Sequence, residues 1–138
     1  MSNISQFIGG RQQQSPAMFF ASSGTYTIPA SGWYRIGALG AGGSGGAIYG
    51  YASAASGGGG GGAFCESEVF LPAGTVLTIT IGAGGASAVS SVFGMGAAGT
   101  AGGNTTVSGP GLATMTAGGG GAGAFTNTDT ETAMGGTG

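Results

Sequence analysis

The sequence predicts an all-β fold: a small β-sandwich-like core with glycine-rich extended segments similar to polyglycine II, and loops, completed by oligomerisation. Short stretches in which apolar and polar residues alternate are typical of strands. No segment carries a helical pattern with capping residues at its ends. Glycine accounts for 36 of the 138 residues, and it is concentrated in tracts between the strand-like stretches.

The predicted strands follow one another along the chain with turn signals between them. Clear signals cover Thr25–Ile28, Trp33–Leu39, Phe64–Leu71 and Thr75–Ile81, and weaker ones cover Asn104–Val107 and Leu112–Thr116. Side chains two residues apart share a face of a strand. We therefore expect Tyr34, Ile36 and Ala38 on one face, and likewise Leu77, Ile79 and Ile81.

The glycine tracts have two interpretations. They lie at Gly37–Gly46, Gly57–Gly62, Gly82–Gly85, Gly94–Gly103 and Gly118–Gly123. They can form extended segments that pack side by side and bond backbone to backbone, with the three-residue turn of polyproline II. The alternative is flexible loops.

Composition argues against an enzyme. The chain has two cationic and four acidic residues and no His. Two cations neutralise too few phosphates for electrostatic nucleic-acid binding. The usual general base near neutral pH is missing, and a single Cys without His makes a zinc site implausible. We expect no cofactor and no metal, and we interpret Cys65 as a small buried apolar residue.

Several apparent motifs are expected by chance at this glycine content. Gly40–Gly45 and Gly94–Gly99 match G-x-G-x-x-G, but neither precedes a helix with an acidic partner. Gly42–Gly46 matches the hydrolase elbow G-x-S-x-G, which needs a His. Glu66 and Glu68 share one strand face, and we interpret them as a solvated outer face.

The chain needs more buried surface than it can build alone. Hydrophobic residues make up 41 % of it, and the net charge is only −2. Disordered chains are poor in apolar residues, whereas small domains bury a small share of their surface. Burial between subunits is therefore expected. No segment has the roughly 20 apolar residues of a membrane helix, and the N-terminus does not have the pattern of a secretory signal.

Three regions are expected. Residues 1–22 form an N-terminal arm, residues 23–123 a glycine-rich β domain, and residues 124–138 a flexible or surface tail. The arm carries the apolar side chains that we expect to anchor it: Ile4, Phe7, Ile8, Phe19 and Phe20. The alternative for this region is a disordered terminus.

The order of the blocks carries a resemblance. Gly24–Gly32 leads into a strand and a glycine tract, and a long glycine tract enters Gly62–Cys65. Leu71–Gly85 then joins a Pro-Ala-Gly turn to a strand and a glycine tract, and Gly102–Val107 precedes Thr116–Gly121. Over about residues 23–123 the chain resembles the glycine-rich domains of bacteriophage tail fibres and related virion adhesins.

The resemblance implies a virion-associated protein, assembled in the cytoplasm of the host bacterium. Its short length suits a short tail-fibre or tip component that contributes to host-surface attachment. A purely architectural role, as a capsid decoration, head fibre or tail connector, is the alternative. The implied partners are copies of itself, as a homotrimer, and other virion proteins through the arm. An ice-binding or wall-matrix protein is a third hypothesis, which the irregular tracts and large aromatics disfavour.

Any selective surface must come from side chains that the glycine tracts display. The candidates for receptor contact are Tyr49, Tyr51, Phe93, Phe125, Asp129 and Glu131. Aromatic rings with a polar tip are effective contact residues, and the two acids can accept hydrogen bonds from a host surface glycan or an outer-membrane protein. The alternative is that the tyrosines pack between subunits.

Overall fold

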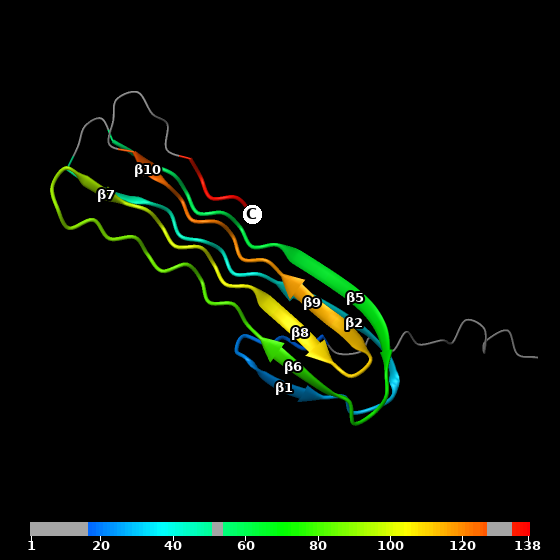
Figure 1. Cartoon of the computed structure of the whole chain (residues 1–138). Helices are drawn as coiled ribbons and strands as arrows, with labels where there is room; N and C mark the ends of the chain where they lie inside the picture. Colours follow the sequence, from blue (N-terminus) through cyan, green and yellow to red (C-terminus); the bar gives the residue numbers. More distant parts are fainter. Residues whose placement is uncertain (1–16, 51–53, 127–133) are drawn as a thin grey trace, which may run out of the picture.

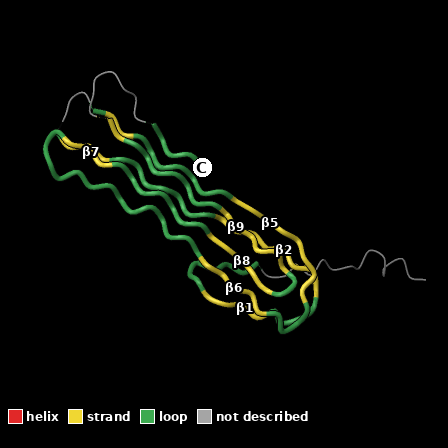
Figure 2. The backbone as a smooth tube through the Cα atoms, viewed as in Figure 1, coloured by secondary structure: helices red, strands yellow, loops and turns green. Residues whose placement is uncertain are grey.

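The computed structural model describes residues 17–50, 54–126 and 134–138. These residues form strands, turns and extended segments and no helix, which confirms the all-β prediction (Figure 2). The strands are β1 (Gly24–Thr27), β2 (Gly32–Leu39), β3 (Ala47–Tyr49), β4 (Ala55–Ser56), β5 (Phe64–Leu71), β6 (Val76–Thr80), β7 (Met95–Ala97), β8 (Thr105–Gly109), β9 (Leu112–Ala117) and β10 (Phe125–Thr126).

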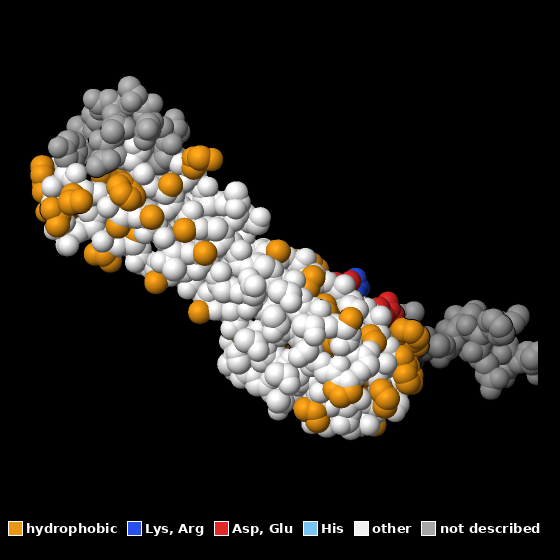
Figure 3. Space-filling model, in the orientation of Figure 1, with side chains coloured by type: hydrophobic (Ala, Val, Ile, Leu, Met, Phe, Trp, Pro, Cys, Tyr) orange, Lys and Arg blue, Asp and Glu red, His pale blue; other side chains and the backbone are white. Residues whose placement is uncertain are grey.

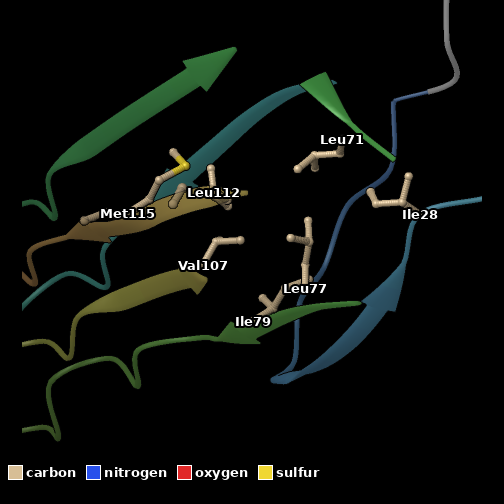
Figure 4. Close-up of a cluster of buried hydrophobic side chains, with 9 residues drawn as sticks. Ile28, Leu71, Leu77, Ile79, Val107, Leu112 and Met115 are labelled. Atoms are coloured by element: carbon tan, nitrogen blue, oxygen red, sulfur yellow. The ribbon is translucent and has the colours of Figure 1, made fainter. Parts of the chain in front are cut away.

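Two antiparallel sheets form the core. One has the strand order β1-β6-β8-β9, and the other pairs β2 with β5. Their facing side chains make one apolar cluster, drawn in Figure 4. Its buried members are Ile28, Ala38, Leu71, Leu77, Ile79, Val107, Leu112, Met115 and Ala117. This is the small sandwich-like core that the sequence predicts.

The predicted strand faces are confirmed. In β2 the side chains of Tyr34, Ile36 and Ala38 face the core, whereas Trp33 and Arg35 are exposed. In β6 the buried positions are Leu77 and Ile79, and Ile81 packs against the cluster just after the strand. Cys65, which was expected to be buried, packs against the core beside Ala38 but is only half-buried.

The predicted turn between β5 and β6 is also present. The amide of Thr75 donates to the carbonyl of Pro72 at 3.2 Å, and Gly74 between them has φ of 82°. A positive φ at the third position of a four-residue turn favours glycine. This explains why the sequence places glycine after Pro72-Ala73.

Beyond the core the glycine tracts pack side by side as extended segments (Figure 1). The amides of Gly40, Gly43 and Gly46 donate to the carbonyls of Ala63, Gly60 and Gly57, at 2.8, 2.9 and 3.0 Å. Bonds at every third residue mark a helix with three residues per turn, and not a β-ladder. The packed interpretation is therefore correct, and the flexible-loop alternative is not.

The tracts form a bundle of two layers. Backbone bonds join neighbours within and between the layers. One layer contains 57–63, 40–46 and 82–86, and the other contains 134–138, 118–124 and 97–103. The segment 40–46 illustrates the contact between layers, because Gly120 donates to the carbonyl of Ala41 and Gly123 to that of Ser44, at 2.8 and 2.9 Å.

Two features differ from the sequence expectations. The short strands β3, β4, β7 and β10 were not predicted, because two or three residues are too few to show alternation. Residues 134–138 were expected in a tail outside the β domain. Instead they lie in the bundle, where Gly121 donates to Thr137 O and Gly136 to Gly58 O.

Candidate functional site

The end of the bundle farthest from the sandwich displays the candidate site (Figure 1). Two small antiparallel ladders lie there, β3 with β7 and β4 with β10. The tracts 40–46, 82–86 and 118–124 run outward from the core to this end, and the others return from it. The bundle thus holds β3, β4, β7 and β10 away from the core.

Tyr49 and Phe93 form an aromatic pair at this end. Their ring centroids lie 6.0 Å apart with an interplanar angle of 89°, an edge-to-face contact. The backbone holds them together, since the amide of Gly94 donates to the carbonyl of Tyr49 at 2.9 Å. Tyr49 is 53 % exposed and Phe93 is 72 % exposed, so a large part of each side chain faces solvent.

Two glycines make room for the aromatic rings. Gly50 has φ of 82°, and a Cβ atom on it would overlap the ring of Phe93. A Cβ atom on Gly96 would overlap the ring of Phe125. Each ring therefore lies directly against glycine backbone, which fixes its position better than contact with a flexible side chain would.

We define the distal patch as the exposed large apolar residues at this end of the bundle. Its members are Tyr49, Val89, Val92, Phe93, Met95, Phe125 and Met134. Figure 3 shows apolar side chains gathered at this end, and a paler stretch with scattered single apolar side chains between them and the sandwich. An exposed apolar group of this kind is typical of an interaction surface.

A family model described as a glycine-rich domain matches residues 20–138. The chain belongs to this glycine-rich domain family. No curated protein and no solved structure matches it.

Three of the predicted receptor-contact residues of this glycine-rich domain lie at the distal end. They are Tyr49, Phe93 and Phe125. The others, Tyr51, Asp129 and Glu131, lie outside the described residues. The receptor-contact prediction did not include the other four members of the distal patch, Val89, Val92, Met95 and Met134. A large side chain directly before a glycine was the signal that could have found Met95 and Met134.

Two of the predicted anchoring residues, Phe19 and Phe20, lie at the opposite end. Phe20 packs its ring on Tyr26 of β1, with centroids 5.5 Å apart, and Phe19 is 93 % exposed. Both line an open apolar cleft of about 1070 Å³ between β2 and the larger sheet. Ile36 and Ile79 of the core also line this cleft. Ile4, Phe7 and Ile8 lie outside the described residues.

The charged side chains of the described residues lie on the outer face of β2 and β5. Arg35 Nη2 and Glu66 Oε1 are 2.7 Å apart. This hydrogen bond, followed by Coulomb attraction to the same carboxylate, raises the pKa of Arg35 above its ordinary value. Glu68 lies on the same face opposite Arg35, so the exposed acidic face expected from the sequence is present.

The apparent catalytic motifs occupy structural positions. Gly40–Gly45 forms part of the bundle and precedes no helix. The hydroxyl of Ser44 donates to the carbonyl of Ala86 at 2.6 Å and accepts from the amide of Thr100 at 2.8 Å. Among the described residues, no group of three or more His, Cys, Asp and Glu could hold a metal ion, and no helix is long and apolar enough to cross a membrane.

Proposed function

We propose that this protein is a short tail-fibre or tip component of a bacteriophage virion and contributes to host-surface attachment. It acts as a binding and structural protein and not as an enzyme. The observation that carries the proposal is the distal patch, which places exposed aromatic side chains at the end of a rigid rod, away from the folded core.

The bundle suits a display function. Its segments are joined by backbone hydrogen bonds, so its shape does not depend on side-chain packing. Glycine offers no side chain for recognition, whereas Tyr49 and Phe93 offer large contact area with few rotatable bonds. Such rings stack on the apolar faces of sugars and fill pockets on proteins. The proposed partner is a host surface glycan or an outer-membrane protein.

The opposite end suits attachment to the particle. Phe19 and Phe20, in the described part of the arm, lie beside the sandwich. We propose that this arm binds another virion protein and that copies of the chain associate, as the fibre resemblance implies. The location that follows is the virion, after assembly in the cytoplasm of the host bacterium.

An architectural role without receptor binding is the second candidate. The observation in its favour is the aliphatic share of the distal patch. Val89, Met95 and Met134 are exposed, and such side chains are also common where subunits stay together permanently. In that role the distal patch would contact another virion protein, and adsorption to the host would not depend on it.

The test is the double change Tyr49→Ala with Phe93→Ala, measured by adsorption of particles to host cells. The expected result is a loss of adsorption with normal particle assembly. Val76→Ala, an exposed residue at the core end, is the matched control and leaves adsorption unchanged. Normal adsorption of the double variant refutes the receptor role, and failure of assembly supports the architectural one.

The arm is tested separately. Deleting residues 2–15 should abolish incorporation into particles while the isolated β domain stays folded, as judged by its circular dichroism. Normal incorporation of the truncated chain would contradict the anchoring role, whatever the outcome at the distal patch.

A further inference from the structure

The outer face of the β2–β5 sheet has the composition of a protein interface. Its side chains form cross-strand rows: Trp33 with Phe70, Arg35 with Glu68, Gly37 with Glu66, and Leu39 with Phe64. We call this set the outer face. Trp, Phe and Arg are enriched at protein interfaces, and Trp and Arg contribute most often to the strongest contacts there.

The outer face is organised and remains exposed. The rings of Trp33 and Phe70 meet edge to face with centroids 5.9 Å apart. A Cβ atom on Gly37 would lie only 3.2 Å from the ring of Phe64, so this ring covers the glycine of the neighbouring row. Even so, Trp33 is 70 % exposed and Phe64 64 % exposed. Trp33 with Phe70, and Leu39 with Phe64, thus form apolar rows at the two ends of the sheet.

Charge divides the middle of the outer face between the strands. Arg35 is on β2, whereas Glu66 and Glu68 are on β5. The described part of the chain, residues 17–50, 54–126 and 134–138, carries no other Asp, Glu, Lys or Arg. The positive and negative side chains of the described residues therefore lie together on one face, between two apolar rows.

We propose that the outer face binds the same face of a second copy of this chain, about a twofold axis parallel to the strands. Rotation about such an axis places each row over the same row of the partner. It also places β2 of one copy over β5 of the other. Arg35 then lies over the partner's Glu68, and Trp33 over the partner's Phe70. Apolar rows meet apolar rows, and the cation meets carboxylates, so the face is complementary to itself.

The other twofold axis in the plane of the contact is disfavoured. With an axis perpendicular to the strands, β2 would lie over β2 of the partner and β5 over β5. The rows would run in the opposite order in the two copies. Glu66 would then lie over the partner's Glu68, which places like charges together in a largely apolar contact. The charge pattern therefore selects the axis parallel to the strands. The contact that we propose joins two copies, whereas the fibre resemblance implies three.

The chosen axis has a consequence for display. Because it runs along the strands, both bundles point in the same direction and both distal patches lie at the same end of the dimer. Two patches on one rigid unit can bind a surface bivalently. This consequence rests on the proposed function, whereas the dimer itself does not.

The dimer is expected to be weak. A ribbon two strands wide and eight residues long measures about 10 Å by about 26 Å. That footprint is smaller than the roughly 800 Å² per partner of a standard interface. Association should therefore depend on protein concentration in the micromolar range.

The experiment uses complementary charge variants of the full chain. Sedimentation velocity and the emission of Trp33, the single tryptophan of the chain, are followed over a concentration series. The natural chain should shift from monomer to dimer, with Trp33 emission moving to shorter wavelength. Arg35→Glu should weaken association at least about tenfold, and so should Glu66→Arg with Glu68→Arg. Mixing the two variants should restore the dimer.

Controls separate this contact from others. Phe93→Ala removes part of the distal patch and should leave dimerisation unchanged, so dimerisation and host adsorption fail independently. Circular dichroism shows whether each charge variant is folded. A chain that stays monomeric over the whole series overturns the proposal. So does a trimer, or a dimer that persists in Arg35→Glu.

Discussion

The carbonyl oxygen of Gly121 occupies the place that a Cβ atom on Gly43 would need. The two residues belong to opposite layers of the bundle, and each layer is held to the other by backbone bonds such as that from Gly120 to Ala41. The same relation recurs three residues earlier, where a Cβ atom on Gly40 would overlap Gly118 O. The bundle therefore needs glycine at a period of three on each inward face.

Gly43→Ala should destabilise the fold, because a backbone carbonyl cannot move aside as a flexible side chain can. Overpacking of this kind costs about 1–3 kcal/mol. Gly61→Ala is the matched control, since a Cβ atom there meets nothing within 4 Å. This variant should leave the stability unchanged or raise the free energy of unfolding by up to about 1 kcal/mol, because alanine restricts the unfolded chain more than glycine does. Urea unfolding measures both, and equal midpoints for the two variants would contradict the packing.

The sequence predicts the core more fully than the bundle. Alternation placed Leu77, Ile79 and Ala38 on buried faces, and all three are in the core. The pairing of tracts was beyond prediction, because glycines carry no side chains that distinguish one neighbour from another. The contact between Tyr49 and Phe93 was equally hidden. It depends on a three-residue strand and on one backbone bond from Gly94.

Ser44→Ala should weaken the junction between tracts. The Ser44 hydroxyl links the carbonyl of Ala86 to the amide of Thr100, which belong to different tracts. Losing it removes both bonds, at a cost of about 1–3 kcal/mol in the free energy of unfolding. Ser87→Ala, at an exposed position near the same tract, is the control and should change stability by less than about 0.5 kcal/mol. Hydrogen exchange at the Thr100 amide should accelerate only in the Ser44 variant.

Leu71→Ala should cause a large loss of stability. Leu71 is 0 % exposed and lies where β5 turns toward β6, against the cluster of both sheets. Truncating a buried leucine removes apolar contact and leaves a cavity, at a cost of about 2–5 kcal/mol. Leu39→Ala, at a position 64 % exposed, should cost less than about 0.5 kcal/mol at low protein concentration. A similar loss in both variants would show that Leu71 is not a core residue.

Gly50→Ala should disturb the distal patch and spare the core. At φ of 82° an alanine is strained, and its Cβ atom would overlap the Phe93 ring. Phe93 must then move, so its edge-to-face contact with Tyr49 is lost. The variant should lower host adsorption if the patch binds the receptor. Its urea midpoint should change little, because the strain is confined to the end of the bundle, which can open locally without unfolding the sandwich. The ring resonances of Tyr49 and Phe93, followed by NMR, report the local change directly. If those resonances stay unchanged while the urea midpoint falls steeply, Gly50 supports the whole fold and not the patch alone.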